Sequence, residues 1–141
     1  MLTGNADNFI VQYNRQLNAA ELIWDKGSDS YSFRKGYLEL ADLMQQHHLR
    51  NALIDVRQRG LSSHTDQLWL FRQFLPSILP SLQETVRLAY VITSEEYQEL
   101  QLQSPNGITE NFSQLLKIHA FCSDQLAREW LLTDNIPVKQ A

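Results

Sequence analysis

Ala52-Leu53-Ile54-Asp55-Val56 is the stretch of sequence that decides the fold. Side chains along a strand point alternately to its two faces, so a run that is apolar at both parities predicts a strand covered on each side. Such strands are typical of sheets whose strands are parallel and whose connections are helices. The sequence therefore predicts an α/β fold, with this strand at the centre of the sheet.

Before this strand, the sequence predicts a hairpin and then a helix. Apolar and polar residues alternate from Phe9 to Tyr13 and again in the run Ala19–Asp25, with a short polar connection between them. Turn and cap residues at 27–30 then precede apolar residues at helical spacing. These residues are Phe33, Tyr37, Leu40, Ala41 and Met44. The hairpin is expected to add an antiparallel strand to the sheet.

After the central strand, helices and strands alternate. A second helix is expected from Thr65 to Leu79, kinked or restarted at Pro76 and Pro80, because proline has no N–H to donate. The run Val86–Ile92 is rich in strand-forming residues, and a capping-box pattern after it predicts a third helix. This alternation favours parallel neighbours for the central strand.

The last third of the chain begins with the strongest turn signal, Ser104–Gly107, and the segment that follows is expected to be the most mobile. Leu116–Phe121 predicts a last strand, and Ser123 or Asp124 can cap a final helix. The predicted order is β-β-α-β-α-β-α-β-α in a mixed sheet. We expect one domain over residues 9–132, with short tails at 1–8 and 133–141.

Composition excludes several classes of protein. The 141 residues carry a net charge of -4, which argues against a general nucleic-acid binder. Cys122 is the only cysteine, so neither an intrachain disulfide nor a cysteine-rich zinc site can form. The first residues have no basic and apolar leader pattern, and no apolar run approaches membrane-spanning length. We therefore expect a cytoplasmic protein without stable membrane insertion.

The sequence carries no catalytic, cofactor or metal motif. The five glycines are isolated, so no phosphate-binding glycine loop can be written. His47 and His48 are adjacent, have no partner at chelating spacing, and are explained by a helix C-terminus that favours positive charge. Ser63, His64 and Asp55 lack the glycine-flanked turn of a nucleophile. We expect no enzyme activity, no cofactor and no metal.

The loop after the central strand is the best candidate for a regulatory or partner-binding site. Ligands approach open α/β sheets at the carboxyl ends of their strands, where Asp55 lies. Asp55 either takes part in a crevice or, as we favour, pairs with an arginine or with loop N–H groups to hold the turn. The candidate residues are Asp55, Arg57, Arg59, Ser62, Ser63, His64 and Thr65.

The second predicted helix has more large apolar residues than one core-facing stripe can hold. Some of them are expected to face a partner or a cavity. Trp69 is the expected anchor of a homodimer, and Trp69, Phe71 and Phe74 form the candidate dimer or apolar-ligand face.

Several stretches together resemble the STAS-like family of small bacterial proteins, which is related in fold to anti-sigma-factor antagonists and grouped with CRAL-TRIO lipid-transfer domains. The resemblance covers about residues 9–132. The stretches that carry it are Ala20-Glu-Leu-Ile-Trp-Asp25, Gly36-Tyr-Leu-Glu-Leu40, Leu53-Ile-Asp-Val-Arg57, Asp66-Gln-x-Trp69 and Phe74-Leu-Pro76. The family implies a mixed sheet of four or five strands with helices packed on it.

The resemblance also implies a function. Antagonists of this kind carry an Asp-Ser-Ser/Thr-Gly pattern after the central strand, and a partner kinase phosphorylates its serine or threonine. The stretch here lacks that Asp and Gly, so only Ser62, Ser63 or Thr65 can take this role, with Arg57 and Arg59 as possible phosphate partners. We expect a non-enzymatic, homodimeric interaction or regulatory module. The alternative is a binder of a small apolar ligand or lipid beneath the second helix.

Overall fold

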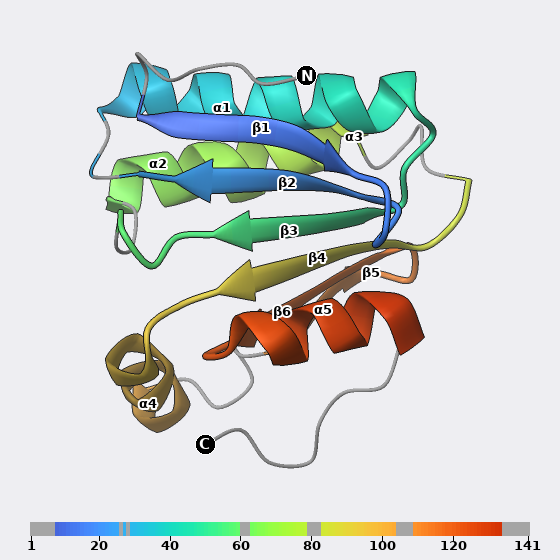
Figure 1. Ribbon diagram of the computed structural model, residues 1–141. Coiled ribbons are helices and arrows are strands. Elements are labelled where there is room, and N and C mark those ends of the chain that lie inside the picture. The colour runs from blue at the N-terminus through green and yellow to red at the C-terminus, as the bar shows by residue number, and fades with distance from the viewer. Residues whose placement is uncertain are drawn as a thin grey trace.

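The computed structural model describes residues 8–25, 27, 29–59, 63–78, 83–103 and 109–133, which form one sheet with helices on both faces (Figure 1). The elements in chain order are β1 (Phe9–Asn14), β2 (Ala19–Trp24), α1 (Ser30–Gln46), β3 (Asn51–Asp55), α2 (His64–Trp69), a π-helical turn (Leu70–Phe74), α3 (Leu75–Ile78), β4 (Val86–Val91), α4 (Ser94–Gln103), β5 (Thr109–Ser113), β6 (Leu116–Phe121) and α5 (Asp124–Thr133). Because α2, the π turn and α3 are continuous, we call them together the α2–α3 helix.

Within the described residues the sheet has six strands in the order β1-β2-β3-β4-β6-β5. β2, β3, β4 and β6 are parallel to one another, whereas β1 and β5 run antiparallel to their neighbours at the two edges. The predicted α/β class, mixed sheet and N-terminal hairpin are confirmed. The expected strand count of four or five omits β5, which lies in the segment expected to be mobile. Its residues Thr109–Ser113 are polar except for one phenylalanine, so its strand character comes from pairing with β6 and not from a hydrophobic pattern.

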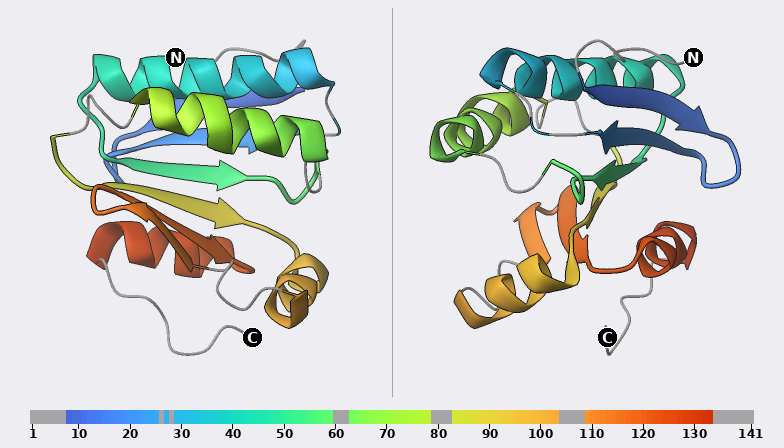
Figure 2. Two further views of the ribbon diagram at one scale, coloured as in Figure 1. Left: turned by 180° about the vertical axis from the view of Figure 1, so that it is seen from behind. Right: turned by 60° about the vertical axis from the view of Figure 1, so that its left-hand side comes forward.

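The helices form two unequal layers. α1 and the α2–α3 helix cover one face of the sheet, and α5 covers the other (Figure 2). Along β3, Ala52 and Ile54 face the core beneath α1, while Leu53 faces the core beneath α5. This arrangement confirms that the central strand is covered on both faces.

The helix ends are held by specific side chains. Asp29 caps α1 by accepting the N–H of Ser32 at 2.8 Å. The predicted capping box before α4 is confirmed, because Thr93 and Glu96 each accept the other's backbone N–H. At the end of α5, the Arg87 guanidinium donates to two carbonyls of the last turn, at 2.9 and 2.8 Å. These contacts fix the start of α1, the start of α4 and the end of α5.

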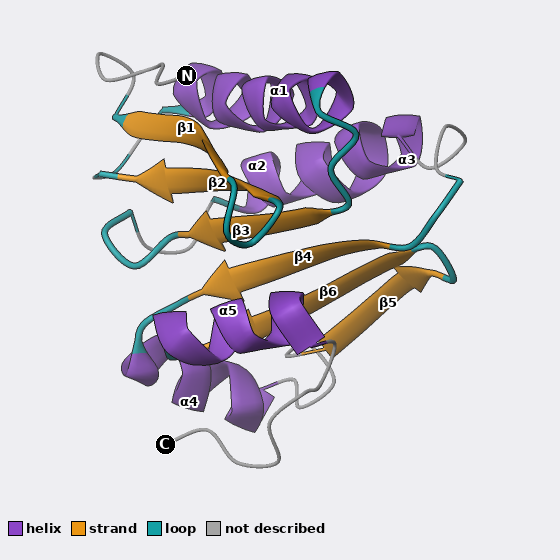
Figure 3. Cartoon of the chain, turned by 45° about the vertical axis from the view of Figure 1, so that its right-hand side comes forward, coloured by secondary structure: helices purple, strands orange, loops and turns teal. Residues whose placement is uncertain are grey.

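Because the central strands are parallel, their carboxyl ends lie together at one end of the sheet and their amino ends at the other (Figure 3). At the carboxyl end, loops leave β3 and β4 toward α2 and α4. At the amino end, chain segments arrive from α1 and from the α2–α3 helix to enter β3 and β4. The candidate loop from the sequence lies at the carboxyl end.

Candidate functional site

Asp55, at the carboxyl end of β3, forms an ion pair with Arg57. Its Oδ1 accepts the backbone N–H of Arg57 at 3.0 Å and the Nε–H at 3.1 Å, and its Oδ2 lies 2.7 Å from Nη2. This hydrogen bonding raises the pKa of the Arg57 guanidinium. The interpretation of Asp55 as a carboxylate that holds the turn through an arginine is confirmed.

Arg59 lies over aromatic rings at the same end of the sheet. Its guanidinium carbon is 5.0 Å from the centroid of Trp24 and 4.8 Å from that of Phe33, and burial lowers its pKa. Trp24 Nε1, Arg59 Nε and Asp66 Oδ1 are buried without a hydrogen-bond partner in the described part of the chain. Arg59 is therefore part of an aromatic packing cluster, separate from the Asp55–Arg57 pair.

The rest of the candidate loop begins the α2–α3 helix. Ser63 is the N-cap of α2, and its Oγ accepts the N–H of Asp66 at 3.2 Å. His64 and Thr65 are exposed, and Ser62 lies outside the described residues. The structure thus brings Asp55 and Arg57 together, uses Ser63 as the cap of this helix, and directs Arg59 elsewhere.

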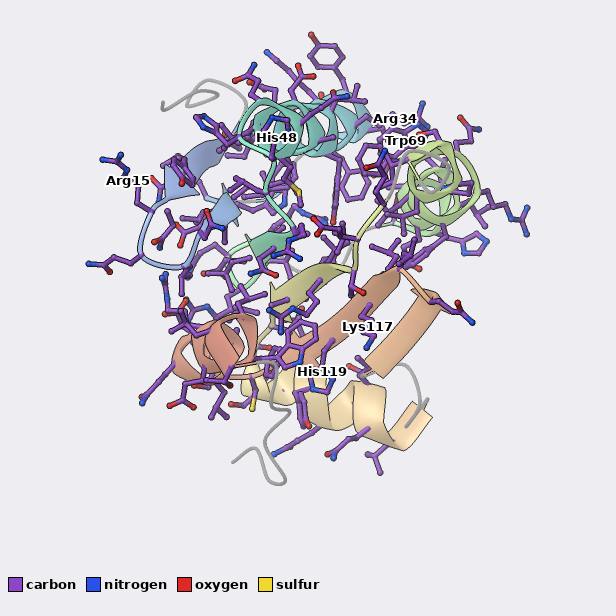
Figure 4. All side chains as sticks on the ribbon, turned by 90° about the vertical axis from the view of Figure 1, so that its right-hand side faces the viewer. Arg15, Arg34, His48, Trp69, Lys117 and His119 are labelled. Carbon is purple, nitrogen blue, oxygen red and sulfur yellow. The ribbon has the colours of Figure 1, made fainter. Side chains whose placement is uncertain are left out.

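The packing of the α2–α3 helix places the three residues of the candidate dimer or apolar-ligand face in different surroundings. Trp69 is half-buried and stacks on Phe74 at 5.3 Å between ring centroids, with Arg34 5.4 Å above it (Figure 4). Phe74 is buried in the core, so of the three residues proposed for this face only Phe71 is exposed. Trp69 therefore packs inward and is half-buried, not fully exposed, and its role as a homodimer anchor stays a prediction.

A π-helical turn explains this difference. At Leu70–Phe74 the helix widens, and the N–H of Leu75 donates to the carbonyl of Leu70, five residues earlier. Residues five apart therefore share a face, which aligns Trp69 with Phe74. With the usual spacing of 3.6 residues per turn, the apolar residues of this segment would cover more than one face of the helix. Pro76 follows directly within α3, and Pro80, the other proline expected to interrupt this helix, lies outside the described residues.

A pocket of about 540 Å³ lies between α1 and the α2–α3 helix, toward the amino end of the sheet. Figure 4 looks onto this end, with His48 just beyond α1. Most of the pocket wall is formed by apolar side chains of α1, the α2–α3 helix and β4. The apolar residues are Leu40, Ala41, Met44, Leu49, Phe74, Leu75, Ile78, Val86 and Leu88.

The polar residues of the pocket lie at its rim or are already paired. Tyr37 shares a hydrogen bond of 2.6 Å between hydroxyls with Tyr90, and burial raises its pKa to about 12. At the rim, Arg50 and Glu84 form an exposed ion pair at 3.5 Å, and His48 is also exposed. The sequence explains His48 by the helix C-terminus alone, because its place at a pocket depends on α3 and β4, which are distant in the chain.

Two buried polar residues beneath α5 also escaped the sequence analysis. Glu21 is only 2% exposed, and its carboxylate contacts Gln12, Asn14 and Arg128 at 2.6, 2.8 and 3.2 Å. His119 is buried against the rings of Phe121 and Trp130, and this burial lowers its pKa to about 4. In the sequence, Glu21 could have been recognised as a buried residue because it stands inside the apolar run 19–24. Both pack α5 against the sheet.

No cluster of three or more histidine, cysteine, aspartate or glutamate side chains in the described part of the chain could hold a metal ion. None of the helices described is long and apolar enough to cross a membrane. Comparisons with models of protein families, with curated proteins and with solved structures find no match for this chain.

Proposed function

We propose that this protein binds a small, largely apolar molecule in the pocket between α1 and the α2–α3 helix. The observation that carries the proposal is the pocket itself. Its volume of about 540 Å³ lies within the range of roughly 300–1,000 Å³ that is usual for ligand sites. Leucine, isoleucine and valine side chains that line such a space gain contacts and lose exposure to water when an apolar ligand fills it.

The shape of the pocket can adapt to its ligand. Met44, on α1, is half-buried and lines the pocket. Its unbranched side chain can change rotamer to fill irregular gaps. Phe74 on the facing helix brings an aromatic wall. These features support selection by hydrophobic shape, with few hydrogen bonds to fix one orientation.

Blocking the pocket tests the proposal. Ala41 lines the pocket from α1, and the next residue, Asp42, is exposed and outside it. Calorimetric titration with 1-decanol should show binding to the wild type and at least tenfold weaker binding to Ala41→Phe, which fills the space. Asp42→Phe, the matched control, should bind like the wild type. Circular dichroism checks that both variants fold.

Two results would overturn the proposal. One is a wild-type protein that binds neither decanol nor any molecule retained through purification, as seen by native mass spectrometry. The other is equal decanol affinity in Ala41→Phe and the wild type, with both correctly folded.

The second candidate function is the interaction module that the family resemblance implies. The observation that favours it is the exposed side chain of Phe71, on the outer face of the α2–α3 helix. If this residue anchors a homodimer, Phe71→Glu should shift sedimentation equilibrium from dimer to monomer. A wild type that is monomeric at high concentration would remove this candidate. A cytoplasmic location suits either function, and fractionation of host cells checks it.

A further inference from the structure

We infer that the ligand is an amphiphile with a carboxylate head, whose hydrocarbon body fills the pocket and whose head binds Arg50 at the rim. The inference rests on the proposed function, because it assigns chemistry to the same pocket. It comes from the contrast between the interior, which offers no hydrogen bonds, and the rim, which offers a cation.

The interior favours hydrocarbon. The hydroxyl of Tyr37, the polar group among its buried lining side chains, is already bonded to Tyr90 at 2.6 Å. In the described residues, no buried side-chain nitrogen or oxygen without a partner belongs to the pocket lining. A polar group placed there would lose its water without gaining a partner. The inserted part of the ligand is therefore apolar.

The rim favours a carboxylate. Arg50 Nη1 lies 3.5 Å from Glu84 Oε1, and the two side chains are 57% and 67% exposed. A guanidinium has five N–H donors arranged as a fork, and this contact uses one nitrogen. A carboxylate head can thus bind the remaining edge of Arg50 while Glu84 stays in place. An ammonium head would have Glu84 as its one acidic partner among the described lining residues, and one oxygen of that carboxylate already contacts Arg50.

His48 adds a second donor at the rim from an unusual backbone position. Its φ of 53° lies in the left-handed region, and it follows α1 where glycine is the usual residue. There the N–H of Leu49 closes the helix by donating to the carbonyl of Met44 at 2.8 Å. A side chain retained in such a conformation points to a role for that side chain. Here His48, like Arg50, is an exposed residue that lines the pocket.

Three ligands with the same chain and different heads test the inference: decanoate, 1-decanol and decylamine. Calorimetric titration of the wild type should show decanoate binding at least about fivefold tighter than decylamine. Arg50→Gln should weaken decanoate binding about fivefold and leave decanol binding within twofold. The matched control is Arg15→Gln, since Arg15 is exposed on the β1–β2 turn and away from the pocket (Figure 4).

Two further readouts test the electrostatic part of the head-group contact. Glu84→Gln should tighten decanoate binding, because it removes a like charge from the rim. Raising the ionic strength should weaken decanoate binding and leave decanol binding unchanged. Arg50 and Glu84 are exposed, so the substitutions at these two residues should leave the protein folded.

The outcomes distinguish this inference from the proposed function. If decanol binds and Ala41→Phe blocks it, but Arg50→Gln leaves decanoate affinity unchanged, the carboxylate inference fails and the pocket remains a ligand site. Tighter binding of decylamine than decanoate overturns the inference in the same way. If none of the three ligands binds the wild type and native mass spectrometry finds no retained molecule, the proposed function fails with it.

Discussion

His48 keeps a side chain in a backbone conformation that favours glycine. The described residues with positive φ besides glycine are Asn8, Asn18 and His48. Asparagine tolerates this region because its side chain can bond locally, and histidine is found there less often than glycine but more often than most residues. The conformation is imposed by the end of α1, where the chain must turn into β3. The strain at His48 is thus the residue-scale cost of placing an imidazole at the pocket rim.

The first prediction is that His48→Gly stabilises the protein. Removal of the Cβ should relieve left-handed strain and raise the free energy of unfolding by about 1 kcal/mol. The same variant should bind decanoate more weakly, because one rim donor is lost. Urea denaturation measures the stability, and titration measures the affinity. Unchanged or lower stability would show that the imidazole makes contacts that offset the strain.

At the level of elements, α1 and β2 approach closely because Gly36 faces Trp24. A Cβ built at Gly36 would lie 2.8 Å from Trp24 Cη2 and 2.9 Å from Cζ2, closer than real contacts allow. The indole has no room to retreat, since it is fully buried between Phe9 and Phe33, with centroid distances of 5.2 and 6.2 Å. The distance between α1 and β2 therefore depends on residue 36 having no Cβ.

The second prediction follows from that contact. Gly36→Ala should lower the free energy of unfolding by about 2 kcal/mol through overpacking, although alanine is the better helix former. In a Trp24→Phe background, which lacks the two clashing carbons, the same change should cost much less. Denaturant unfolding of the four proteins in this cycle measures the coupling. An equal cost in both backgrounds would contradict the explanation.

Across the whole molecule, His119 links the packing of α5 to pH. Burial against Phe121 and Trp130 lowers its pKa to about 4, from 6.5 for the ordinary group. The unfolded chain therefore binds a proton more readily than the folded protein between these pH values. The contribution of the neutral imidazole to stability is complete above pH 6.5 and is lost as the pH falls toward 4.

The third prediction is an acid-sensitive fold. Between pH 6.5 and 4, the wild type should lose about 3 kcal/mol of unfolding free energy through His119, beyond the effect of its carboxylates. His119→Phe should remove this part of the slope, whatever its stability at neutral pH. Chemical denaturation at a series of pH values measures both curves. Parallel curves for the two proteins would show that His119 is not the group responsible.

The sequence by itself determined those elements whose formation depends on residues close together in the chain. The run 52–56 identified the central strand because apolar side chains at both parities need cover on both faces. Alternation in residues 9–13 identified the hairpin, and the caps at Asp29, Ser63 and Thr93 marked three helix starts. The hydrogen-bonding partner of Asp55 was also foreseeable, since Arg57 is two residues away.

Tertiary structure alone decided the features that join distant segments. β5 is a polar strand that exists through its pairing with β6, and the π turn rotates Trp69 inward so that it stacks on Phe74. The pocket needs α1, α3 and β4 together, and its rim pairs Arg50 with Glu84 from different connections. Periodicity reports which face of an element is apolar, but not which element covers that face or what space the packing leaves between them.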